Sequence, residues 1–307
     1  MLALLLGLAL GADVAPPREE PSAPAAASVA PSVESADAGV VTPADATTAS
    51  PAKTPYELKW DPRIDLPVTG VLIAGWLTTE LTKPSLAPDT CRWCATNAFD
   101  NAFRSLFNPS FEPSASGVKS IGTASDITAF MALPISMLTL DAVLAWREGT
   151  LLKTMPVDLV LVAEATFGAL ALTQLTKFLV GRARPYSVGA SPELIAQGSD
   201  PADATLSFFS GHTSFAFAIS TATATVLTLR GYKYAWLAWA IGMPLATTTA
   251  ILRLAADKHW ASDVLVGMLI GSAVGVGVPL LFHGRVTPSV SLRVMPMPNG
   301  VAFSGTF

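Results

Sequence analysis

The chain contains few charged residues, few histidines and almost no cysteine. Only 14% of its 307 residues are Asp, Glu, Lys or Arg, whereas 51% are hydrophobic and the mean hydropathy is +0.48. This balance is typical of a protein that crosses a membrane several times, and it argues against a soluble globule. The formal net charge of −4, with no basic cluster interleaved with aromatic residues, argues against a nucleic-acid partner.

The two cysteines, Cys91 and Cys94, form a Cys-Arg-Trp-Cys stretch. A zinc site would need two further ligands, and the sequence holds no second pair of Cys or His residues to supply them. A thioredoxin-like redox pair would need a strand-to-helix setting, which the flanking residues do not predict. Two interpretations stay open: a local disulfide in an oxidising compartment, or two inert thiols.

The first part of the chain predicts no folded domain. Residues 1–12 are apolar but too short to span a bilayer, so they predict the core of a signal peptide. Residues 13–55 are rich in Ala, Pro, Ser and Thr and contain almost no large apolar side chains, which predicts a disordered linker. From Tyr56 onward the composition changes, and ordered structure is expected.

Six apolar segments follow, most of them near the ~20 residues that a spanning helix needs. They predict an all-α fold, a six-helix transmembrane bundle. The segments are 66–81, 125–146, 155–176, 208–229, 234–252 and 263–282. Region 56–124 holds the first segment and the cysteine pair. Within it, the helical spacing of four apolar residues predicts an amphipathic helix at the membrane interface: Phe99, Phe103, Leu106 and Phe107.

Basic residues in the connections predict an orientation. Arg147 and Lys153 follow the second segment, Arg230 and Lys233 follow the fourth, and Arg285 follows the sixth. If basic connections stay in the cytoplasm, the other ends of these segments face outward. Six spans would then place the ordered N-terminal part in the cytoplasm, whereas a cleaved signal peptide would place it outside. The first segment is therefore re-entrant or interfacial, or residues 1–12 are not a cleaved signal.

Three acids lie within the apolar segments. Asp158 is near a helix start, where the helix dipole favours a carboxylate, and Asp141 is near the predicted cytoplasmic end. Glu164 lies deeper, so it is interpreted as a hydrogen-bonded partner inside the bundle or as a functional residue. A bundle that tolerates these acids also fits a wholly periplasmic helical protein. The tail, 286–307, alternates around Asn299-Gly300, which predicts a small β-hairpin.

Three short stretches, far apart in the sequence, combine the groups that a phosphoryl site requires. They are Lys177 to Pro185, Phe209 to His212, and Arg253 to Asp263. Together they contain fixed cations, a glycine at the start of an apolar segment, and two of the chain's three histidines; the third is His283. Cations and backbone N–H groups bind phosphate oxygens, and a histidine can attack phosphorus or donate a proton. Under the orientation above, all three stretches reach one membrane face.

The stretches resemble the type 2 phosphatidic acid phosphatase superfamily, whose signature is K-x6-R-P, P-S-G-H and S-R-x5-H-x3-D. The resemblance covers roughly residues 125–285. It departs from the signature at Phe209, in place of the motif proline, and at Leu252, in place of the serine. Neither departure removes a charged or proton-transferring residue. The residues that match are Lys177, Arg184, Pro185, Ser210, Gly211, His212, Arg253, His259 and Asp263.

The resemblance implies a role for each matching residue. His259 is the expected nucleophile, which forms a phosphohistidine, and Asp263 is expected to orient it. His212 is the expected general acid, which later activates water. The phosphate-binding residues are expected to be Lys177, Arg184, Ser210, Gly211 and Arg253. Arg182, outside the pattern, is interpreted as an interface residue with its charge in water. No metal ligand set accompanies these residues, so catalysis without a metal or cofactor is expected.

The substrate implied is a lipid phosphate or diphosphate, hydrolysed at the exoplasmic face of a bacterial-type inner membrane, toward the periplasm or exterior. Phosphatidate, phosphatidylglycerol phosphate, undecaprenyl diphosphate and lipid A phosphate all fit, and nothing in the sequence bears on oligomeric state. One alternative is a vanadium-dependent haloperoxidase, which shares the same cradle, although the hydrophobic spans argue against it. Another is a non-catalytic protein that binds phospholipid.

Overall fold

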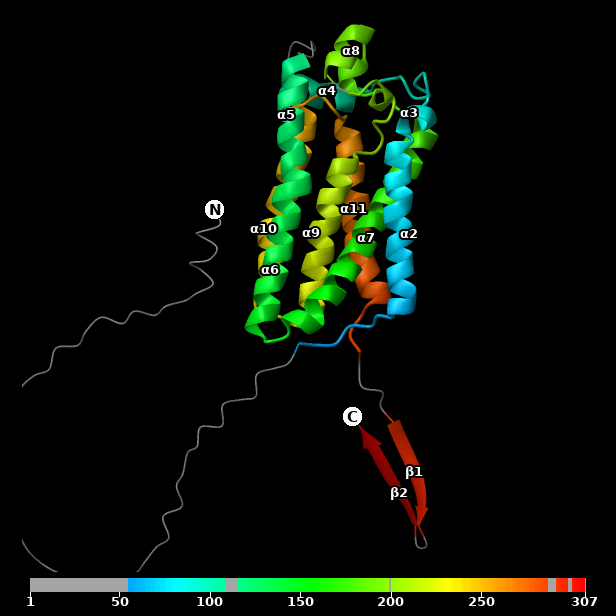
Figure 1. The fold of residues 1–307 in the computed structure, drawn as a ribbon, viewed down its shortest axis with the longest axis vertical. Helices are drawn as coiled ribbons and strands as arrows, with labels where there is room; N and C mark the ends of the chain where they lie inside the picture. Colours follow the sequence, from blue (N-terminus) through cyan, green and yellow to red (C-terminus); the bar gives the residue numbers. More distant parts are fainter. Residues whose placement is uncertain (1–54, 109–114, 199, 287–290, 298–299, 307) are drawn as a thin grey trace, which may run out of the picture. The chain divides into compact units, whose positions relative to one another are not determined.

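The computed structural model describes residues 55–108, 115–198, 200–286, 291–297 and 300–306. The predictions for the apolar segment 1–12 and for linker residues 13–54 lie outside the described residues. The long helices run side by side, and their labels follow the chain in Figure 1. They are α2 (Pro62–Leu81), α5 (Ala115–Ile127), α6 (Leu133–Arg147), α7 (Leu151–Val180), α9 (Gly211–Arg230), α10 (Trp236–Ala255) and α11 (Ala261–Phe282). The π-helical turn η1 (Thr128–Ala132) joins α5 to α6 without a break.

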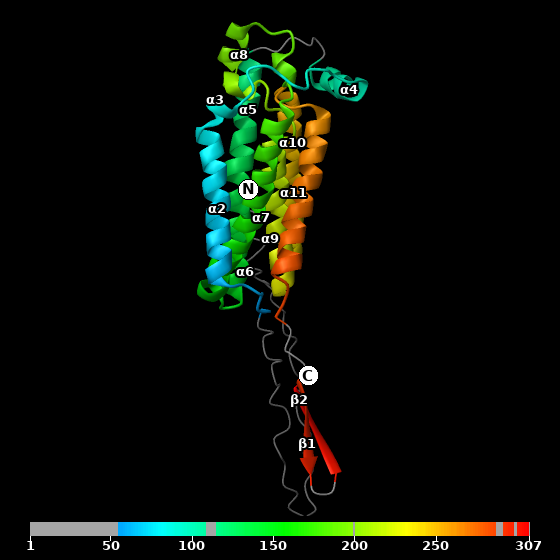
Figure 2. The ribbon, with the colours of Figure 1, turned by 90° about the vertical axis from the view of Figure 1, so that its right-hand side faces the viewer.

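Short elements connect the long helices. Figures 1 and 2 both place α3, α4 and α8 at the same end of the bundle. The short elements are α3 (Lys83–Leu86), α4 (Ala98–Phe107), η2 (Pro185–Ser187), α8 (Pro192–Gly198) and η3 (Pro201–Asp203). In the tail, β1 (Ser291–Met297) pairs antiparallel with β2 (Gly300–Thr306), with Met297 opposite Gly300.

Five helical stretches are long and apolar enough to cross a membrane. They are Pro62–Leu81, Lys119–Arg147, Leu151–Val180, Trp236–Ala255 and Ala261–Phe282. Each contains or largely overlaps one of the predicted apolar segments, so the all-α, membrane-spanning fold is confirmed. The remaining segment, 208–229, corresponds to α9, which has 20 residues but is not among the five.

Helix α9 is more polar than its neighbours because it lies in the centre of the bundle. It packs against α7, α10 and α11, and most of its residues are buried. Its hydroxyl side chains donate to backbone carbonyls one turn back in the same helix, as Ser220 does to Ala216 and Thr221 to Phe217. Buried hydroxyls satisfied in this way cost little, so a helix shielded from lipid tolerates them.

Helix α11 approaches α9 closely through a stripe of glycines spaced four residues apart. A Cβ atom on any of them would lie within 3 Å of α9 or the residue before it. The glycines are Gly267, Gly271 and Gly275. At Gly271 the nearest atoms are all backbone atoms of Ser214, which cannot rotate away. Small residues at this spacing let two helix backbones meet, which is how spanning helices commonly associate.

Two of the ionisable residues inside the bundle form a pair. Asp158 is 1% exposed and accepts hydrogen bonds from Nε and Nη2 of Arg230, at 2.9 and 2.6 Å. The sequence places Arg230 in a cytoplasmic connection; the structure instead makes it the last residue of α9, buried against α7. A buried charge requires a partner, and the two helices supply it to each other.

We predict that Gly271→Ala lowers the free energy of unfolding by about 1–3 kcal/mol, because the added methyl group must push the backbones of α9 and α11 apart. Gly277→Ala is the matched control, since a Cβ there meets nothing within 4 Å. It should leave stability unchanged or raise it by up to about 1 kcal/mol, as removing a helical glycine does. Denaturant unfolding in detergent micelles measures both, and equal effects would contradict the close approach.

Candidate active site

His259 lies in the loop between α10 and α11, and its side chain is buried. Its Nδ1 is 2.8 Å from the backbone carbonyl oxygen of Ser207. A carbonyl oxygen can only accept, so Nδ1 carries the proton and Nε2 of the neutral ring holds a lone pair. This Nε2 has no hydrogen-bond partner among the described residues. The loop therefore holds the ring in the tautomer that leaves Nε2 available for attack.

The surroundings keep this ring neutral. Burial lowers the pKa of His259 well below its usual value, and the positive charges of Arg184, Arg253 and Lys177 lower it further. Contacts place the two arginines near His259. Nη1 of Arg184 donates to the carbonyl of Lys258, the residue before His259, at 3.4 Å, and the N–H of Lys258 donates to the carbonyl of Arg253 at 3.1 Å. The structure thus brings together the histidine and the cations from all three motifs.

The predicted hydrogen bond between His259 and Asp263 is absent. Nδ1 of His259 and Oδ2 of Asp263 are 3.7 Å apart, too far for a hydrogen bond. Ser207 lies between them: its carbonyl accepts from His259, and its hydroxyl donates to Asp263. The spacing of four residues does not give helical geometry here because α11 begins only at Ala261. Asp263 therefore reaches His259 through Ser207 as well as through its charge.

Asp263 is held at the start of α11. It is fully buried, and its Oδ2 accepts the backbone N–H of Trp260 at 3.0 Å. This bond satisfies one of the N–H groups that a helix start leaves without a partner inside the helix. A carboxylate at this position is also stabilised by the helix dipole.

Arg182 is not the interface residue that the sequence predicts. It is 1% exposed, and its guanidinium bridges two buried carboxylates, Asp263 through Nη1 and Asp100 through Nη2. Its planar head also lies 4.0 Å from the ring centre of Trp93. The prediction is wrong because α4 folds over this end of the bundle and carries Asp100 inward. The one sequence feature that could have indicated this role is the position of Arg182 within the first motif stretch, two residues before Arg184.

The three predicted phosphate-binding cations come from different elements. Lys177 is in the last turn of α7, Arg184 is in the loop that follows, and Arg253 is in the last turn of α10. Arg184 and Arg253 are almost completely buried. Nε of Arg184 donates to the carbonyl of Asp203 at 2.7 Å, and Nη1 of Arg253 donates to the hydroxyl of Ser125 at 2.9 Å. These bonds fix both guanidinium groups before any ligand arrives.

Ser210 and Gly211 begin α9. Ser210 is the N-cap, and its Oγ accepts from the backbone N–H of Thr213. Gly211 faces Lys177, and a Cβ there would lie 3.2 Å from the lysine Nζ. The missing side chain thus leaves room for an ammonium group beside a helix N-terminus, where an anion is favoured. The predicted phosphate contact from the Ser210 hydroxyl remains a prediction, because the structure uses this hydroxyl to cap the helix.

His212, the second residue of α9, has a carboxylate partner that the sequence analysis missed. Its Nε2 is 2.7 Å from Oδ1 of Asp126, and Nη1 of Arg253 is 3.4 Å from the same oxygen. Phe130 packs edge-on against the imidazole, with ring centres 4.7 Å apart. Asp126 gave no signal because it stands at the edge of an apolar segment, outside every motif.

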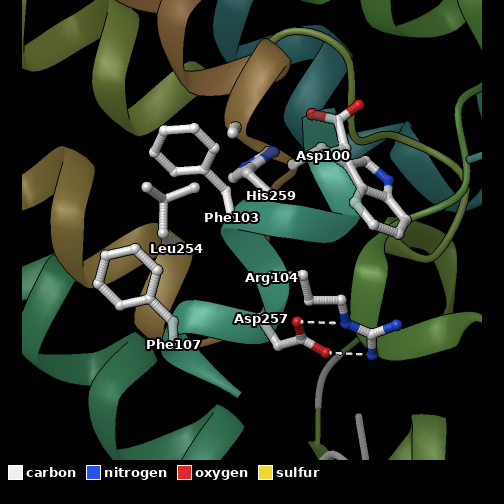
Figure 3. A pocket seen from close by; sticks show the side chains of 9 residues that line it. Asp100, Phe103, Arg104, Phe107, Leu254, Asp257 and His259 are labelled. Atoms are coloured by element: carbon white, nitrogen blue, oxygen red, sulfur yellow. Dashed lines mark hydrogen bonds and ion pairs between the residues drawn. The ribbon is translucent and has the colours of Figure 1, made fainter. Parts of the chain in front are cut away.

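Helix α4 covers the His259 loop. Arg104 makes two hydrogen bonds to the carboxylate of Asp257, at 2.9 and 2.6 Å, which Figure 3 shows as dashed lines. A cavity of about 10 Å³ lies beside α4, and Arg104 and His259 are among the residues that line it. On the other side, Phe99 and Leu106 are exposed. The helix is amphipathic as predicted, with its polar groups joined to the site.

Lys258 is a further cation that the motifs did not single out. It directly precedes His259 and is 9% exposed, with Nζ 5.1 Å from the ring centre of Tyr186. Burial, together with the charges of Arg184 and Arg253, lowers its pKa to about 8. A bound phosphate would stabilise the charged form of this lysine.

The cysteine pair lies at the same end as the site. Cys91 and Cys94 form a disulfide, which decides between the two interpretations left open by the sequence. The residues between them bind the chain around Arg182: the N–H of Arg92 donates to the carbonyl of Gly181 at 2.9 Å, and the carbonyl of Trp93 accepts from Ala183 at 3.1 Å. Gly181 has a φ of 58°, which lets α7 end there.

No metal-ligand cluster occurs in this site among the residues that the structure describes. Elsewhere in the described part of the chain, Asp65, Glu164 and His283 form one group of side chains close enough together to hold an ion. His283 directly follows α11, whereas His259 precedes its start, so this group and the active site are separated by a helix of 22 residues.

Comparison with known proteins finds a matching family model and two similar phosphatases. The family model of the PAP2 superfamily matches residues 158–286, which contain all three motifs. The chain is 36% identical over 100 residues to a lipid A 1-phosphatase of Porphyromonas gingivalis; the match covers 32% of this chain and 18% of that protein. A transmembrane PAP2-type phosphatidylglycerolphosphate phosphatase from Bacillus subtilis matches with a TM-score of 0.42 and 16% identity, over 70% of this chain and 93% of that one.

Residues 158–286 thus match the PAP2 superfamily, the family that the motifs resemble. Asp100 and Asp126 lie before the matched range, so the preceding part of the chain supplies partners to Arg182 and His212 within it.

We predict that Arg182→Met lowers the free energy of unfolding by about 3–5 kcal/mol, because it leaves two buried carboxylates without a cation. Adding Asp100→Asn should recover part of the loss, since one of these charges is then removed. Arg63→Met, on the exposed start of α2, is the control and should cost little. Denaturant unfolding of the purified protein measures all three variants. An Arg182→Met variant as stable as the control would contradict the buried bridge.

Proposed function

We propose that this protein is a membrane phosphatase that hydrolyses a lipid phosphate or diphosphate without a metal ion, through a phosphohistidine. The observation that carries the proposal is the state of His259. Its Nδ1 proton is held by a backbone carbonyl, its Nε2 has no partner among the described residues, and three buried or half-buried cations act on it. A neutral imidazole beside fixed cations is what nucleophilic attack on a phosphorus atom requires.

In the first step, Nε2 of His259 forms a bond to phosphorus, and the bond from phosphorus to the leaving oxygen breaks. His212 gives its proton to that oxygen, so the lipid leaves as an alcohol or, from a diphosphate, as a monophosphate. Lys177, Arg184 and Arg253 neutralise the charge on the non-transferring oxygens. The charge that develops on the His259 ring is stabilised by Asp263, which Arg182 and Ser207 hold in place.

In the second step, His212 takes a proton from water, and the oxygen attacks phosphorus. The bond to His259 breaks, inorganic phosphate leaves, and both rings return to their starting states. Asp126, 2.7 Å from His212, is placed to stabilise the protonated form of that ring before the first step and after the second.

Membrane helices and the matched relative support a lipid substrate. The site lies at one end of the spanning helices, where a lipid head group would reach it. The relative's printed name gives a phosphate on lipid A as one chemistry that fits. We infer a lipid whose phosphate is a monoester or diphosphate, because attack by His259 requires an alcohol or phosphate leaving group.

Two features support a site facing the periplasm or exterior. The disulfide between Cys91 and Cys94 lies at the site end, and disulfides persist in oxidising compartments. Arg147, Lys153 and Lys233 lie at the opposite end, as basic residues on a cytoplasmic face do. The buried Arg230 no longer contributes to this second argument.

We predict that His259→Ala is inactive on every substrate, because no phosphoenzyme can form. His212→Ala should lose about 10²–10⁴-fold on lipid phosphates, the usual value of general acid catalysis. It should retain most activity on an aryl phosphate, whose leaving group needs no proton. Asp263→Asn should fall between the two. Phosphate release from both substrates measures the rates.

Trapping of acid-labile phosphoenzyme after a rapid quench assigns the roles. Label that persists in His259→Ala and disappears in His212→Ala would exchange them. The wild-type protein should stay active in EDTA and be inhibited by vanadate, which mimics the transferring phosphoryl group. Activity that EDTA abolishes and a divalent ion restores would overturn the metal-free mechanism.

We predict that a cysteine at the site end reacts with an impermeant thiol reagent in intact spheroplasts. Glu193→Cys places it on the exposed part of α8, in a background with serine at positions 91 and 94. Glu148→Cys, exposed in the turn between α6 and α7, is the matched control and should be labelled only after lysis. The opposite pattern would reverse the orientation.

A further inference from the structure

The far end of the bundle contains a cluster of polar side chains that the proposed reaction does not use. Asp65 lies in the first turn of α2, Glu164 in α7, and His283 directly after α11. Figures 1 and 2 place the start of α2 and the end of α11 at the end opposite α4 and α8. Since α11 has 22 residues, this cluster is separated from His259 by roughly 33 Å.

His283 is held with one nitrogen aimed into the cluster. Its side chain is 3% exposed, and its Nδ1 is 3.1 Å from the backbone carbonyl oxygen of Lys59. Because this oxygen can only accept, Nδ1 carries a proton, which leaves Nε2 as the nitrogen that can bind a ligand. A backbone carbonyl that fixes the second nitrogen in this way is the usual outer partner of a metal-binding histidine.

The free nitrogen of His283 faces a carboxylate oxygen. Its Nε2 is 3.7 Å from Oε2 of Glu164, and neither atom has a hydrogen-bond partner among the described residues. One ligand atom from each of Asp65, Glu164 and His283 lies within 4.8 Å of the others. This buried group, with a second carboxylate beside it, is stabilised by a positive charge between its members, which a metal ion can supply.

Helix α2 provides a second reason to expect an ion here. The two side chains that it buries, Asp65 and Thr69, are both polar and stand one turn apart. The hydroxyl of Thr69 has no partner in the described part of the chain. Burying polar groups in this way opposes docking of α2 unless a ligand compensates for their lost hydration.

We propose that Asp65, Glu164 and His283 bind a divalent transition-metal ion, which fastens α2 and the end of α11 to α7. One imidazole nitrogen and two carboxylates form a ligand set that suits Zn²⁺, and the two negative charges balance the ion. The sequence analysis did not find this set because its members are separated by about a hundred residues each. The ion is structural, so the proposal is independent of the proposed phosphatase activity.

The test uses the full-length protein, purified in detergent and stripped with a chelator, with Zn²⁺ alone as the probe. Bound zinc per chain and the unfolding temperature are measured together. The wild-type protein should bind one zinc per chain and unfold at a higher temperature, because a ligand that binds only the folded state stabilises it. His283→Ala and Glu164→Gln should each lose zinc binding and the shift in unfolding temperature.

Asp141→Asn is the matched control. Asp141 is also a buried acid in a spanning helix with an unpartnered oxygen, but it lies outside the cluster. This variant should bind zinc as the wild-type protein does. If His283→Ala and Glu164→Gln bind zinc as the wild-type protein does, the ion lies elsewhere, for instance at the histidines of the active site, and the proposal is overturned.

A wild-type protein that binds no zinc would also overturn it and would leave a shared proton between Glu164 and His283. If the variants fail to fold, Co²⁺ bound to the wild-type protein gives a second measurement. One coordinated imidazole nitrogen should appear in its pulsed electron paramagnetic resonance spectrum, together with visible ligand-field bands. Spectra without a nitrogen ligand, or with two, contradict the proposed ligand set.

Discussion

The buried bridge from Asp100 through Arg182 to Asp263 is the interaction on which the rest of the site depends. It joins three separate parts of the chain: α4, the loop after α7, and the start of α11. Taking these charges out of water costs several kcal/mol per ion, and only good geometry repays this cost. Ser262 provides some of it, since its N–H and hydroxyl both donate to Asp100 at 2.9 Å. The bridge therefore fixes Asp263, and Asp263 and Ser207 together fix His259.

The central helix makes this arrangement possible. Helix α9 carries the N-terminus at which Ser210, Gly211 and His212 stand, so its position sets the position of the site. The glycine stripe on α11 lets the two backbones meet, and the N–H of Ser210 donates to the carbonyl of Asp263 at 3.1 Å. A side chain on that stripe would move the start of α9 away from the start of α11. The packing of α9 against α11 is thus coupled directly to the proposed chemistry.

The two ends of the bundle use buried charge for different purposes. At the site end, the charges that act on His259 are chiefly those of the three predicted phosphate-binding cations, which suits an anionic ligand. At the far end, carboxylates dominate: Asp158 is matched by Arg230, whereas Asp65 and Glu164 face a histidine. The excess of carboxylates at the far end supports the proposed metal ion. Glu164 has no part in the proposed reaction because the length of α11 separates it from His259.

The sequence by itself determined the helical class, the approximate spans, and the residues of the three motifs, because hydrophobic runs and motif spacings are local properties. It also predicted an amphipathic helix around Phe99 and Phe103. The partners were decided only by the tertiary structure. Arg182 was assigned to the interface, Asp126 had no motif, and Ser207 was not expected between His259 and Asp263. Each of these contacts joins residues more than 50 positions apart, and the pairing of buried charges at such separation depends on how the helices pack.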